Sequence, residues 1–481
     1  MRPRISLLED AQYELILDEA LRILAEVGVK VAGTGLRQRL LDDGFTTDPS
    51  SGRVLFPQER EQRAIVAVPA SFTLYDRNGD AYIQIGGGTT HFAPGSSGLN
   101  VLDHRTGEHR RATSADLVEY VHVGDQLKSI DLMATAFSSD DIEPIVSDAW
   151  RLYLLLANST KPFVSGAFSE HGVPRLVELM RLYRRDAADL VARPMAICTV
   201  TAAGSFTYNE DSCQNLIDLV EAGVPVEVVP VTLMGLTAPV TTLGAAAFHT
   251  AEVLAGVTMV QAVRLGAATL FGGAPATFHM QNTTSPMTAT EALRLTSISS
   301  LMGTHLGMPT QAYTSFSESK VLDAQAGSET GMGALLAVSA GIACVSGPGM
   351  LDYLLTFSLP KLVMDDAIAA QALHFGRDIG PAGDLPTTEL TKELLNEGHV
   401  LTAHHTMENW PSELHLPGPV WDREAYDKWS SAGGLDLPAR ANAEVERLLA
   451  EYEPPDSDPA IDAEARAIIR SGMSDGAELP A

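Results

Sequence analysis

The spacing of hydrophobic positions divides the chain into parts with different rhythms. In the first part, Leu15, Ile16, Ala20 and Ile23 recur at intervals of three and four residues, which predicts an amphipathic helix over 6–27. Short β-like pieces and an Asn-Gly turn follow before residue 88, among them Ile65–Val68. This part of the chain is therefore predicted to be a small α/β unit.

From about residue 89, short apolar segments alternate with helical segments. Most of them are continuously apolar, which is the pattern of strands buried on both faces of a parallel sheet. The predicted strands are Ser97–Leu102, Leu132–Phe137, Pro162–Gly166, Met195–Val200, Val226–Val231, Thr269–Gly272, Thr310–Tyr313 and Ile342–Val345. Eight strand–helix units close a (β/α)8 TIM barrel, so the predicted fold class is α/β with this architecture.

These rhythms predict three regions. Residues 1–88 form an N-terminal α/β cap, 89–380 the catalytic barrel, and 381–481 a C-terminal helical extension with an acidic tail. The most apolar long run, Leu243–Leu265, contains His249 and Glu252. These polar residues favour a buried helix of a water-soluble domain over a membrane span.

Charge and cysteine content exclude several classes of function. The 481 residues carry a formal net charge of −28, so the basic surface that a nucleic-acid-binding protein needs is missing. Cys198, Cys213 and Cys344 show no CxxC spacing and no disulfide framework. We therefore expect a cytoplasmic protein that binds neither nucleic acid nor membrane.

Polar and aromatic residues collect where the predicted strands end, above all in the stretch Tyr313–Phe357. In α/β proteins this edge of the sheet binds ligands. Its aromatic side chains could be an ordinary lid or a cage that holds a cation. His399, His404 and His405 could supply zinc ligands, but packing of a C-terminal segment is the favoured interpretation, and no metal is predicted.

Longer motifs carry a resemblance to a known family. They are NVLDHRTGEHRRATSADL (Asn100–Leu117), STKPFVSGAF (Ser159–Phe168), FGGAPATFHMQN (Phe271–Asn282), the Ser319–Asp352 segment with its DAQAG motif, and the C-terminal HHTMENW. With them the chain resembles the trimethylamine methyltransferase superfamily, whose members pass a methyl group from a methylated amine to a corrinoid protein. The resemblance implies a TIM barrel with its active site at the C-terminal mouth of the strands.

One departure from the family pattern affects the expected substrate. The archaeal trimethylamine enzymes carry the electrophilic residue pyrrolysine shortly after DAQAG, whereas this chain has ordinary residues there, with Thr330 at or beside the corresponding position. The chain therefore resembles the non-pyrrolysine branch, in which glycine betaine methyltransferase acts on a quaternary amine. We expect methyl transfer from a quaternary amine, with glycine betaine the leading candidate, to Co(I) of a corrinoid.

The resemblance, together with the position of residues after the predicted strands, also indicates partners and site residues. The corrinoid (cobalamin) would come from a partner protein or be free rather than tightly bound, and a homo-oligomer is expected. Candidate catalytic residues are His279, Gln325 and Glu329, and candidate substrate-binding residues are Tyr313, Phe316, Gly347, Gly349, Tyr353 and Phe357. Two alternatives stay open: another methylated amine or sulfonium donor or a folate acceptor, and a non-catalytic protein that binds a methylated osmolyte.

Overall fold

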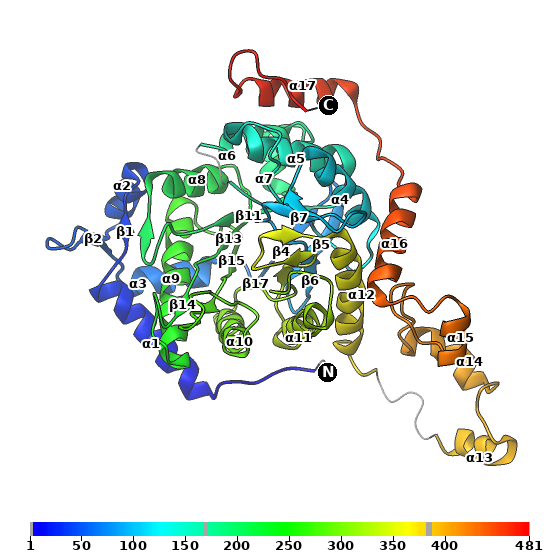
Figure 1. The fold of residues 1–481 in the computed structure, drawn as a ribbon. Coiled ribbons are helices and arrows are strands. Elements are labelled where there is room, and N and C mark those ends of the chain that lie inside the picture. Colours follow the sequence, from blue (N-terminus) through cyan, green and yellow to red (C-terminus); the bar gives the residue numbers. More distant parts are fainter. Residues whose placement is uncertain (1–2, 168–170, 381–386, 481) are drawn as a thin grey trace.

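A closed barrel of parallel strands forms the centre of the molecule (Figure 1). The structure, a computed structural model, describes residues 3–167, 171–380 and 387–480. Within these ranges the barrel has eight strands: β6 (His91–Ala93), β9 (Met133–Ala134), β10 (Phe163–Gly166), β11 (Ala196–Val200), β13 (Val226–Val228), β15 (Thr269–Phe271), β17 (Gln311–Tyr313) and β18 (Cys344–Ser346). This arrangement confirms the predicted (β/α)8 fold class.

Two isolated bridges close the barrel. One sheet runs in the order β15-β13-β11-β10-β9 and a second in the order β17-β18-β6, and neighbouring strands in both are parallel. The parallel bridges Phe271↔Thr310 and Phe92↔Ile130 join the two sheets at both of their edges. Because all strands run the same way, their carboxyl ends meet at one mouth.

The predicted first strand, Ser97–Leu102, is wrong. The barrel begins instead with β6, only three residues long. Its neighbour in sequence, β7 (Asn100–Leu102), pairs antiparallel with β8 (His109–Arg111) and parallel with β20 (Thr356–Phe357). With β19 (Met350–Leu351), these strands make a separate four-stranded sheet.

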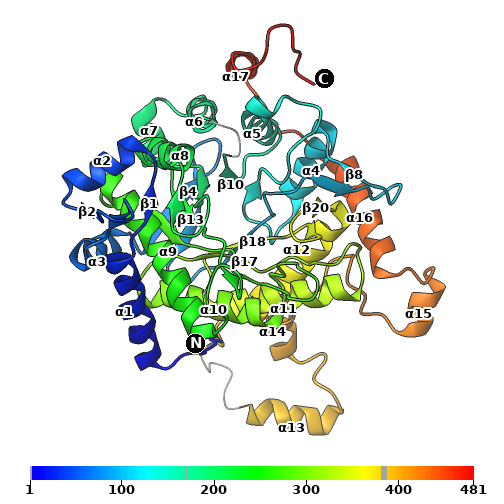
Figure 2. The ribbon, with the colours of Figure 1, turned by 60° about the vertical axis from the view of Figure 1, so that its left-hand side comes forward.

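Helices surround the barrel strands (Figure 2). They are α4 (Ser114–Gln126), α5 (Ser147–Asn158), α6 (Val173–Arg181), α8 (Glu210–Glu221), α9 (Thr242–Val263), α10 (Thr290–His305), α11 (Ala324–Ala340) and α12 (Leu359–Phe375). Side-chain caps fix several starts: Thr113 and Asp116 form a capping box at α4, and Asp323 accepts the Ala326 N–H at α11.

Helix α9 is apolar and long enough to cross a membrane by length and composition. However, it is buried within the body, where α1 (Asp10–Glu26) and α3 (Gln58–Ala67) pack against it. This placement agrees with the predicted core helix. The segment Ile65–Val68, predicted to be β-like, belongs mainly to α3, because its apolar residues continue the helix that packs on α9.

A hairpin from the N-terminal region fills the lower end of the barrel. Strands β4 (Ser71–Tyr75) and β5 (Ala81–Gly86) pair antiparallel and place Leu74 and Ile85 in one apolar cluster with residues of the barrel interior. The other members of that cluster are Ala93, Leu132, Val164, Ile197, Leu270, Ala343 and Cys344. All are at most 2% exposed, so the hairpin is the floor of the barrel.

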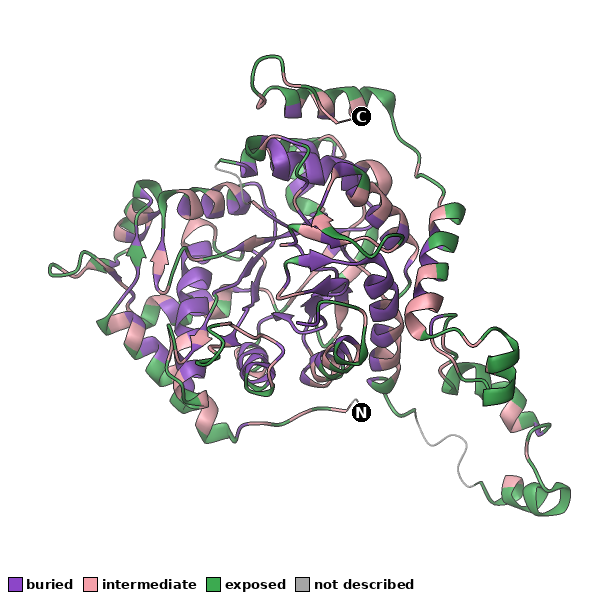
Figure 3. Ribbon diagram, in the orientation of Figure 1, coloured by how far each residue is buried: buried purple, intermediate pink, exposed green. Residues whose placement is uncertain are grey.

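The C-terminal region combines packed and exposed helices (Figure 3). Helix α16 (Leu437–Glu451) packs on α12 and α4, and α17 (Pro459–Arg470) packs on α5 and α6. Between α12 and α16 lie α13 (Thr388–Glu397), α14 (His404–Glu413) and α15 (Tyr426–Ser431), none of which contains a buried residue. Figure 1 shows these three helices extending away from the barrel.

Candidate active site

A layer of polar side chains lies directly above the apolar floor. Side chains two residues apart on a strand point to the same face. Thr199 follows Ile197 at this interval and Ser346 follows Cys344, and both apolar partners belong to the floor cluster. Glu227 lies in register with both Thr199 and Leu270, another floor residue, so its side chain also points into the barrel.

Glu227 is the most unusual member of this layer. The residue is 0% exposed. Its Oε1 accepts a hydrogen bond of 2.7 Å from the Thr199 hydroxyl, whereas the buried Oε2 has no hydrogen-bond partner among the described residues. Burial raises the pKa of Glu227 to about 7, although the Thr199 hydrogen bond opposes this shift. A carboxyl group that is half-ionised near neutral pH and has a free oxygen is a candidate ligand-binding group.

Gln311 and Tyr313, both on β17, complete the layer. The Gln311 amide nitrogen lies 3.4 Å from the Ser346 hydroxyl, and its Oε1 accepts the Gly273 N–H at 3.3 Å. Burial, and secondly the charge of Glu227, raise the pKa of Tyr313, so its phenol stays protonated and can donate a hydrogen bond. Tyr313 is 8% exposed and also interacts with the Ser96 and Thr199 hydroxyls.

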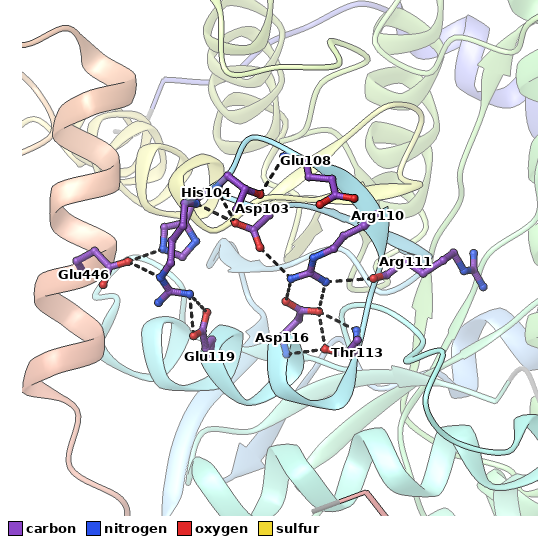
Figure 4. Close-up of polar contacts among 11 residues, drawn as sticks. Asp103, His104, Glu108, Arg110, Arg111, Thr113, Asp116, Glu119 and Glu446 are labelled. Atoms are coloured by element: carbon purple, nitrogen blue, oxygen red, sulfur yellow. Dashed lines mark hydrogen bonds and ion pairs between the residues drawn. The ribbon is translucent and has the colours of Figure 1, made fainter.

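The hairpin of β7 and β8 is tied to two helices by charged side chains (Figure 4). Arg110 donates to both oxygens of Asp116 at 2.7 Å and to Asp103 at 3.0 Å. Arg105 donates to Glu446 of α16 at 2.9 Å and to Glu119 of α4. The motif Asn100–Leu117 therefore forms a hairpin fixed between α4 and the C-terminal region.

The profile of the family "Trimethylamine methyltransferase (MTTB)" matches residues 1–476. The chain belongs to this family. It is similar to the glycine betaine methyltransferase of Desulfitobacterium hafniense (strain Y51), with 28% identity over 469 residues that cover 97% of each chain.

Other relatives are named for trimethylamine or monomethylamine instead of glycine betaine. The trimethylamine methyltransferase MttB of Desulfitobacterium hafniense (strain DSM 10664 / DCB-2) is 23% identical over 460 residues, covering 96% of this chain and 92% of the relative. MttB of Methanosarcina barkeri is 25% identical over 463 residues, covering 93% and 91%. The monomethylamine methyltransferase MtmB of Methanosarcina barkeri superimposes with a TM-score of 0.51 at 11% identity, covering 97% and 88%, and shares the fold. The chain is a methyltransferase of this family.

Of the residues predicted for the methyltransferase site, Tyr313 lies in the polar layer, whereas Phe316 and Phe357 are buried in packing roles. Phe316 is 0% exposed and lies against Gly347. Phe357 contacts the rings of Tyr120 and Phe137, with centroids 5.0 and 5.3 Å away. No ring contact among the described residues joins Phe316, Tyr353 and Phe357 into one cage.

Gly347 and Gly349 allow close packing rather than offering free amides. A Cβ atom at Gly349, whose φ is +84°, would lie 2.6 Å from the Phe357 ring. The Gly349 N–H already donates to Asp365 at 2.8 Å, and the Gly347 N–H donates to the Ala93 carbonyl at 3.1 Å. Neither amide is free to bind the carboxylate of a ligand in this arrangement.

Tyr353 already binds a cation from its own chain. The Lys320 ammonium lies 4.5 Å from the centroid of the Tyr353 ring, while its Nζ also donates to the Glu318 carbonyl. Tyr353 and its neighbours Asp352 and Leu354 all have positive φ values, which are strained for residues other than glycine. The ring face is therefore suited to a cation, and access for another one requires that Lys320 move away.

The predicted catalytic residues lie in loops and at a helix start. Glu329 accepts hydrogen bonds from the Ser317 hydroxyl at 2.6 Å, the Glu318 N–H at 2.9 Å and Gln325 at 2.9 Å. His279 is exposed in a turn where its Nδ1 accepts the Asn282 N–H. Within the described residues, no hydrogen bond connects Glu329, Gln325 or His279 to Glu227.

Thr330 belongs to a buried ion-pair cluster. Its hydroxyl accepts a hydrogen bond of 2.7 Å from the Lys361 ammonium, which also donates to Asp365 at 2.7 Å. All three residues are 0% exposed. Because Asp365 also accepts the Gly349 N–H, Thr330 and its partners support the loop after β18.

Glu227 and Gln311 of the polar layer were not among the candidate site residues predicted from the sequence. A signal was present for Glu227, because it is the one charged residue in the apolar run Val224–Val231. A charged side chain on a strand of a closed barrel must point either into the barrel or toward the surrounding helices. Burial in either place costs folding free energy unless the charge has a partner or serves a function.

Proposed function

We propose that this methyltransferase transfers a methyl group from glycine betaine, or a closely similar quaternary amine, to Co(I) of a corrinoid that a partner protein supplies. The observation that carries the proposal is the buried Glu227 carboxyl with its free Oε2. A quaternary ammonium has no N–H to donate, so it needs a nearby negative charge rather than a matched hydrogen-bond acceptor. The 28% identity to a glycine betaine methyltransferase supports the choice of donor.

For this methyl transfer, the chain has to bind the methyl donor and orient it. The C–N bond breaks with its electron pair left on nitrogen, and the Co(I) acceptor supplies the electron pair for the new bond to the methyl group. The leaving amine is neutral, so no general acid is required. Glu227 would hold the cation at the base of the mouth, and the barrel walls would direct one methyl group toward the opening.

Hydrogen-bond donors for a betaine carboxylate are available beside Glu227. The Gln311 amide makes only a 3.4 Å contact with Ser346, and the Tyr313 phenol is protonated. Ser315 follows β17 with a buried hydroxyl that has no partner among the described residues. In this proposal Tyr353 binds the cation only after Lys320 leaves its ring, and Glu329 with Gln325 fixes the loop at Ser317–Glu318.

Trimethylamine is the second candidate donor. A protonated tertiary amine carries one N–H, which could donate to the free Oε2 of Glu227. The relatives named for trimethylamine are 23% and 25% identical to this chain. The Glu227 carboxyl would therefore provide only its charge to glycine betaine, but both its charge and a hydrogen-bond acceptor to protonated trimethylamine.

The proposal is tested by removing charge from the protein and from the ligand separately. Calorimetry would compare glycine betaine with 3,3-dimethylbutanoate, which has a carbon atom in place of the cationic nitrogen, on the wild type and on Glu227→Gln. We expect the wild type to bind glycine betaine at least about tenfold more tightly than its carbon analogue, a difference of about 1.4 kcal/mol, and Glu227→Gln to lose this preference. Equal preference in both proteins would contradict the role of Glu227.

Turnover assays separate the donors and acceptors. Glycine betaine, trimethylamine and a sulfonium would each be tested with Co(I) cobalamin and with tetrahydrofolate. Methyl transfer from glycine betaine to cobalt supports the proposal. Transfer only from trimethylamine supports the second candidate, transfer to folate refutes the corrinoid acceptor, and tight binding without turnover indicates an osmolyte-binding protein.

A further inference from the structure

Three polar side chains, Glu252, Thr232 and His249, are buried behind the barrel wall and are called the buried row here. His249 and Glu252 belong to α9, which packs against the strands β13 and β15 (Figure 1). Thr232 follows β13 in the chain. His249 and Thr232 are 0% exposed and Glu252 is 4% exposed, so their polar atoms need partners inside the protein.

Hydrogen bonds connect the members of the buried row to one another and to the barrel. The Thr232 hydroxyl lies 2.8 Å from Nδ1 of His249 and 3.2 Å from Oε2 of Glu252. On the other side of the imidazole ring, Nε2 of His249 lies 3.2 Å from the Gly272 carbonyl oxygen. The second carboxyl oxygen of Glu252 accepts the Phe206 N–H at 3.0 Å. Every polar atom of these three side chains therefore has a partner.

The hydrogens of the buried row can be placed by starting from the Gly272 carbonyl. A carbonyl oxygen only accepts, so Nε2 of His249 carries a hydrogen and donates it. Burial lowers the pKa of His249 to about 4, so the ring is neutral at pH 7 and its Nδ1 accepts from the Thr232 hydroxyl. This hydroxyl has a single hydrogen, so the Glu252 carboxyl is the donor in its own contact with Thr232. Burial raises the pKa of Glu252 to about 7, which allows the carboxyl to keep this proton near neutral pH.

One peptide group links the buried row to the polar layer inside the barrel. The carbonyl of Gly272 and the N–H of Gly273 belong to the same peptide group, which is planar. The oxygen of this group accepts from His249, and its N–H donates to Oε1 of Gln311 at 3.3 Å. Because the group is planar, a rotation would disturb both contacts together. The orientation of His249 is therefore passed on to Gln311.

The close contacts on both sides of this peptide group require glycine. A Cβ atom at Gly273 would lie 2.2 Å from the His249 ring, and one at Gly272 would lie 2.8 Å from Oε1 of Gln311. Both distances are too short for van der Waals contact. The two glycines belong to the segment Phe271–Asn282 that carries part of the family resemblance. Their place between His249 and Gln311 gives this part of the segment a role.

The peptide group also decides which end of the Gln311 amide faces the polar layer. A glutamine side chain ends in an oxygen that accepts and an NH2 group that donates, and a half-turn exchanges the two. The Gly273 N–H can only donate, so it selects the oxygen. The NH2 group then faces Ser346, at 3.4 Å from its hydroxyl. A hydrogen-bond donor is thus presented on the ligand side of Gln311.

We propose that the buried row positions Gln311 as a hydrogen-bond donor for the carboxylate of a betaine. Glu252, Thr232 and His249 act on the ligand only through the peptide group, so they are positioning residues rather than catalytic residues. The proposal rests on the proposed function, because it takes a betaine as the ligand. It adds the group that recognises the carboxylate, whereas Glu227 attracts the cationic end.

The test compares glycine betaine with tetramethylammonium, which has a similar cationic head but no carboxylate, by calorimetry on the full chain. The ratio of the two dissociation constants reports recognition of the carboxylate, whereas a general loss of structure would weaken both ligands alike. His249→Asn removes the donor to Gly272, and His249→Gln is the matched control, because its amide nitrogen can take the place of Nε2. We expect the preference for glycine betaine to fall about tenfold in His249→Asn and to be kept in His249→Gln.

Further variants test the other members of the buried row, with thermal melts to establish that each is folded. Thr232→Val removes the hydroxyl that fixes the imidazole ring, so the preference should fall at least about threefold, whereas Thr232→Ser should keep it. Glu252→Gln should also keep it, because an amide can accept from Phe206 and donate to Thr232 as the protonated carboxyl does. Gln311→Ala should lose the preference, and adding His249→Asn to it should cause no further loss.

Crystal structures without ligand separate this proposal from the proposed function. In His249→Asn we expect the Gly272–Gly273 peptide group to turn and its contact with Gln311 to be lost, while His249→Gln keeps both. A turned peptide group in a protein that does not bind glycine betaine would support the positioning of Gln311 and refute the methyl donor. An unturned group in His249→Asn, or an unchanged preference in folded His249→Asn or Thr232→Val, would overturn the role of the buried row.

Discussion

The Thr199 hydroxyl donates a 2.7 Å hydrogen bond to Oε1 of Glu227, and this bond opposes the effect of burial on the carboxyl group. The two residues lie opposite each other on the neighbouring strands β11 and β13. Thr199 therefore lowers the pH above which the Glu227 carboxyl carries a negative charge.

Replacing Thr199 with Val should move the pH dependence of ligand binding upward. Glu227 is ionised above its pKa of about 7, so affinity for a cation rises with pH through this value. Loss of the hydrogen bond raises the pKa further. A shift of about one unit would lower the ionised fraction at pH 7 from about one half to about one tenth and weaken binding about fivefold, with recovery near pH 9. Calorimetry with glycine betaine from pH 6 to 9 measures the shift.

Thr199→Ser is the matched control for this measurement, because it keeps the hydroxyl group. We expect its binding profile to follow that of the wild type. A Thr199→Val profile that superimposes on the wild-type profile would mean that the charge of Glu227 does not govern binding.

Replacing Glu61 with Gln should stabilise the protein at neutral and alkaline pH. Glu61 is 0% exposed, neither of its oxygens has a hydrogen-bond partner among the described residues, and burial raises its pKa to about 9. Because the folded-state pKa lies above the ordinary 4.5, the folded protein binds the proton more tightly, and stability falls as pH rises from about 4.5 to 9. The gain from Gln should be on the order of 2 kcal/mol at pH 8 and much smaller at pH 5.5.

Urea unfolding at the two pH values measures this difference. Glu59→Gln is the control, since Glu59 lies on the same helix but is exposed. The interpretation fails if Glu61→Gln and Glu59→Gln change the free energy of unfolding equally at both pH values.

Phe357 and Tyr353 should respond differently to truncation. Phe357 is 1% exposed and packs on Tyr120 and Phe137, so Phe357→Ala should lower the free energy of unfolding by about 3–5 kcal/mol. Tyr353 is half-buried and contacts Lys320, so Tyr353→Ala should cost less than about 1.5 kcal/mol while changing affinity for the amine.

Denaturant melts combined with calorimetry on each folded variant distinguish the two roles. Tyr353→Phe keeps the ring and should bind as the wild type does. Unchanged affinity in Tyr353→Ala would remove Tyr353 from the ligand site, and a fully stable Phe357→Ala would contradict its packing role.

The sequence predicted the barrel because most of its strands are continuously apolar and separated by helices. The strand His91–Ala93 was missed because it is only three residues long and begins with a histidine, whereas Asn100–Leu102 has strand-like character that serves the sheet of β7, β8, β19 and β20. The division into the regions 1–88, 89–380 and 381–481 remains a prediction, and so does the oligomeric state.

The polar layer inside the barrel was harder to predict than the fold. Tyr313 and Phe357 were both predicted because they lie at or after the end of a predicted strand. Tyr313 does lie in the polar layer, whereas the ring of Phe357 packs in the core against Tyr120 and next to Gly349. Glu227 lies within a strand rather than after one, so a search of strand ends could not find it. Which face a strand residue occupies depends on register with its neighbours, and that register is a property of the closed barrel.

The hairpin that fills the floor of the barrel has a kinetic consequence. With Leu74 and Ile85 packed among the lower strand residues, a ligand above Glu227 would enter and leave by the mouth, where the methyl acceptor must also arrive. The amine would therefore have to bind before the acceptor, and the demethylated amine could depart only after the acceptor had left. Steady-state kinetics should then show a compulsory-order ternary complex, in which the bound acceptor prevents release of the amine.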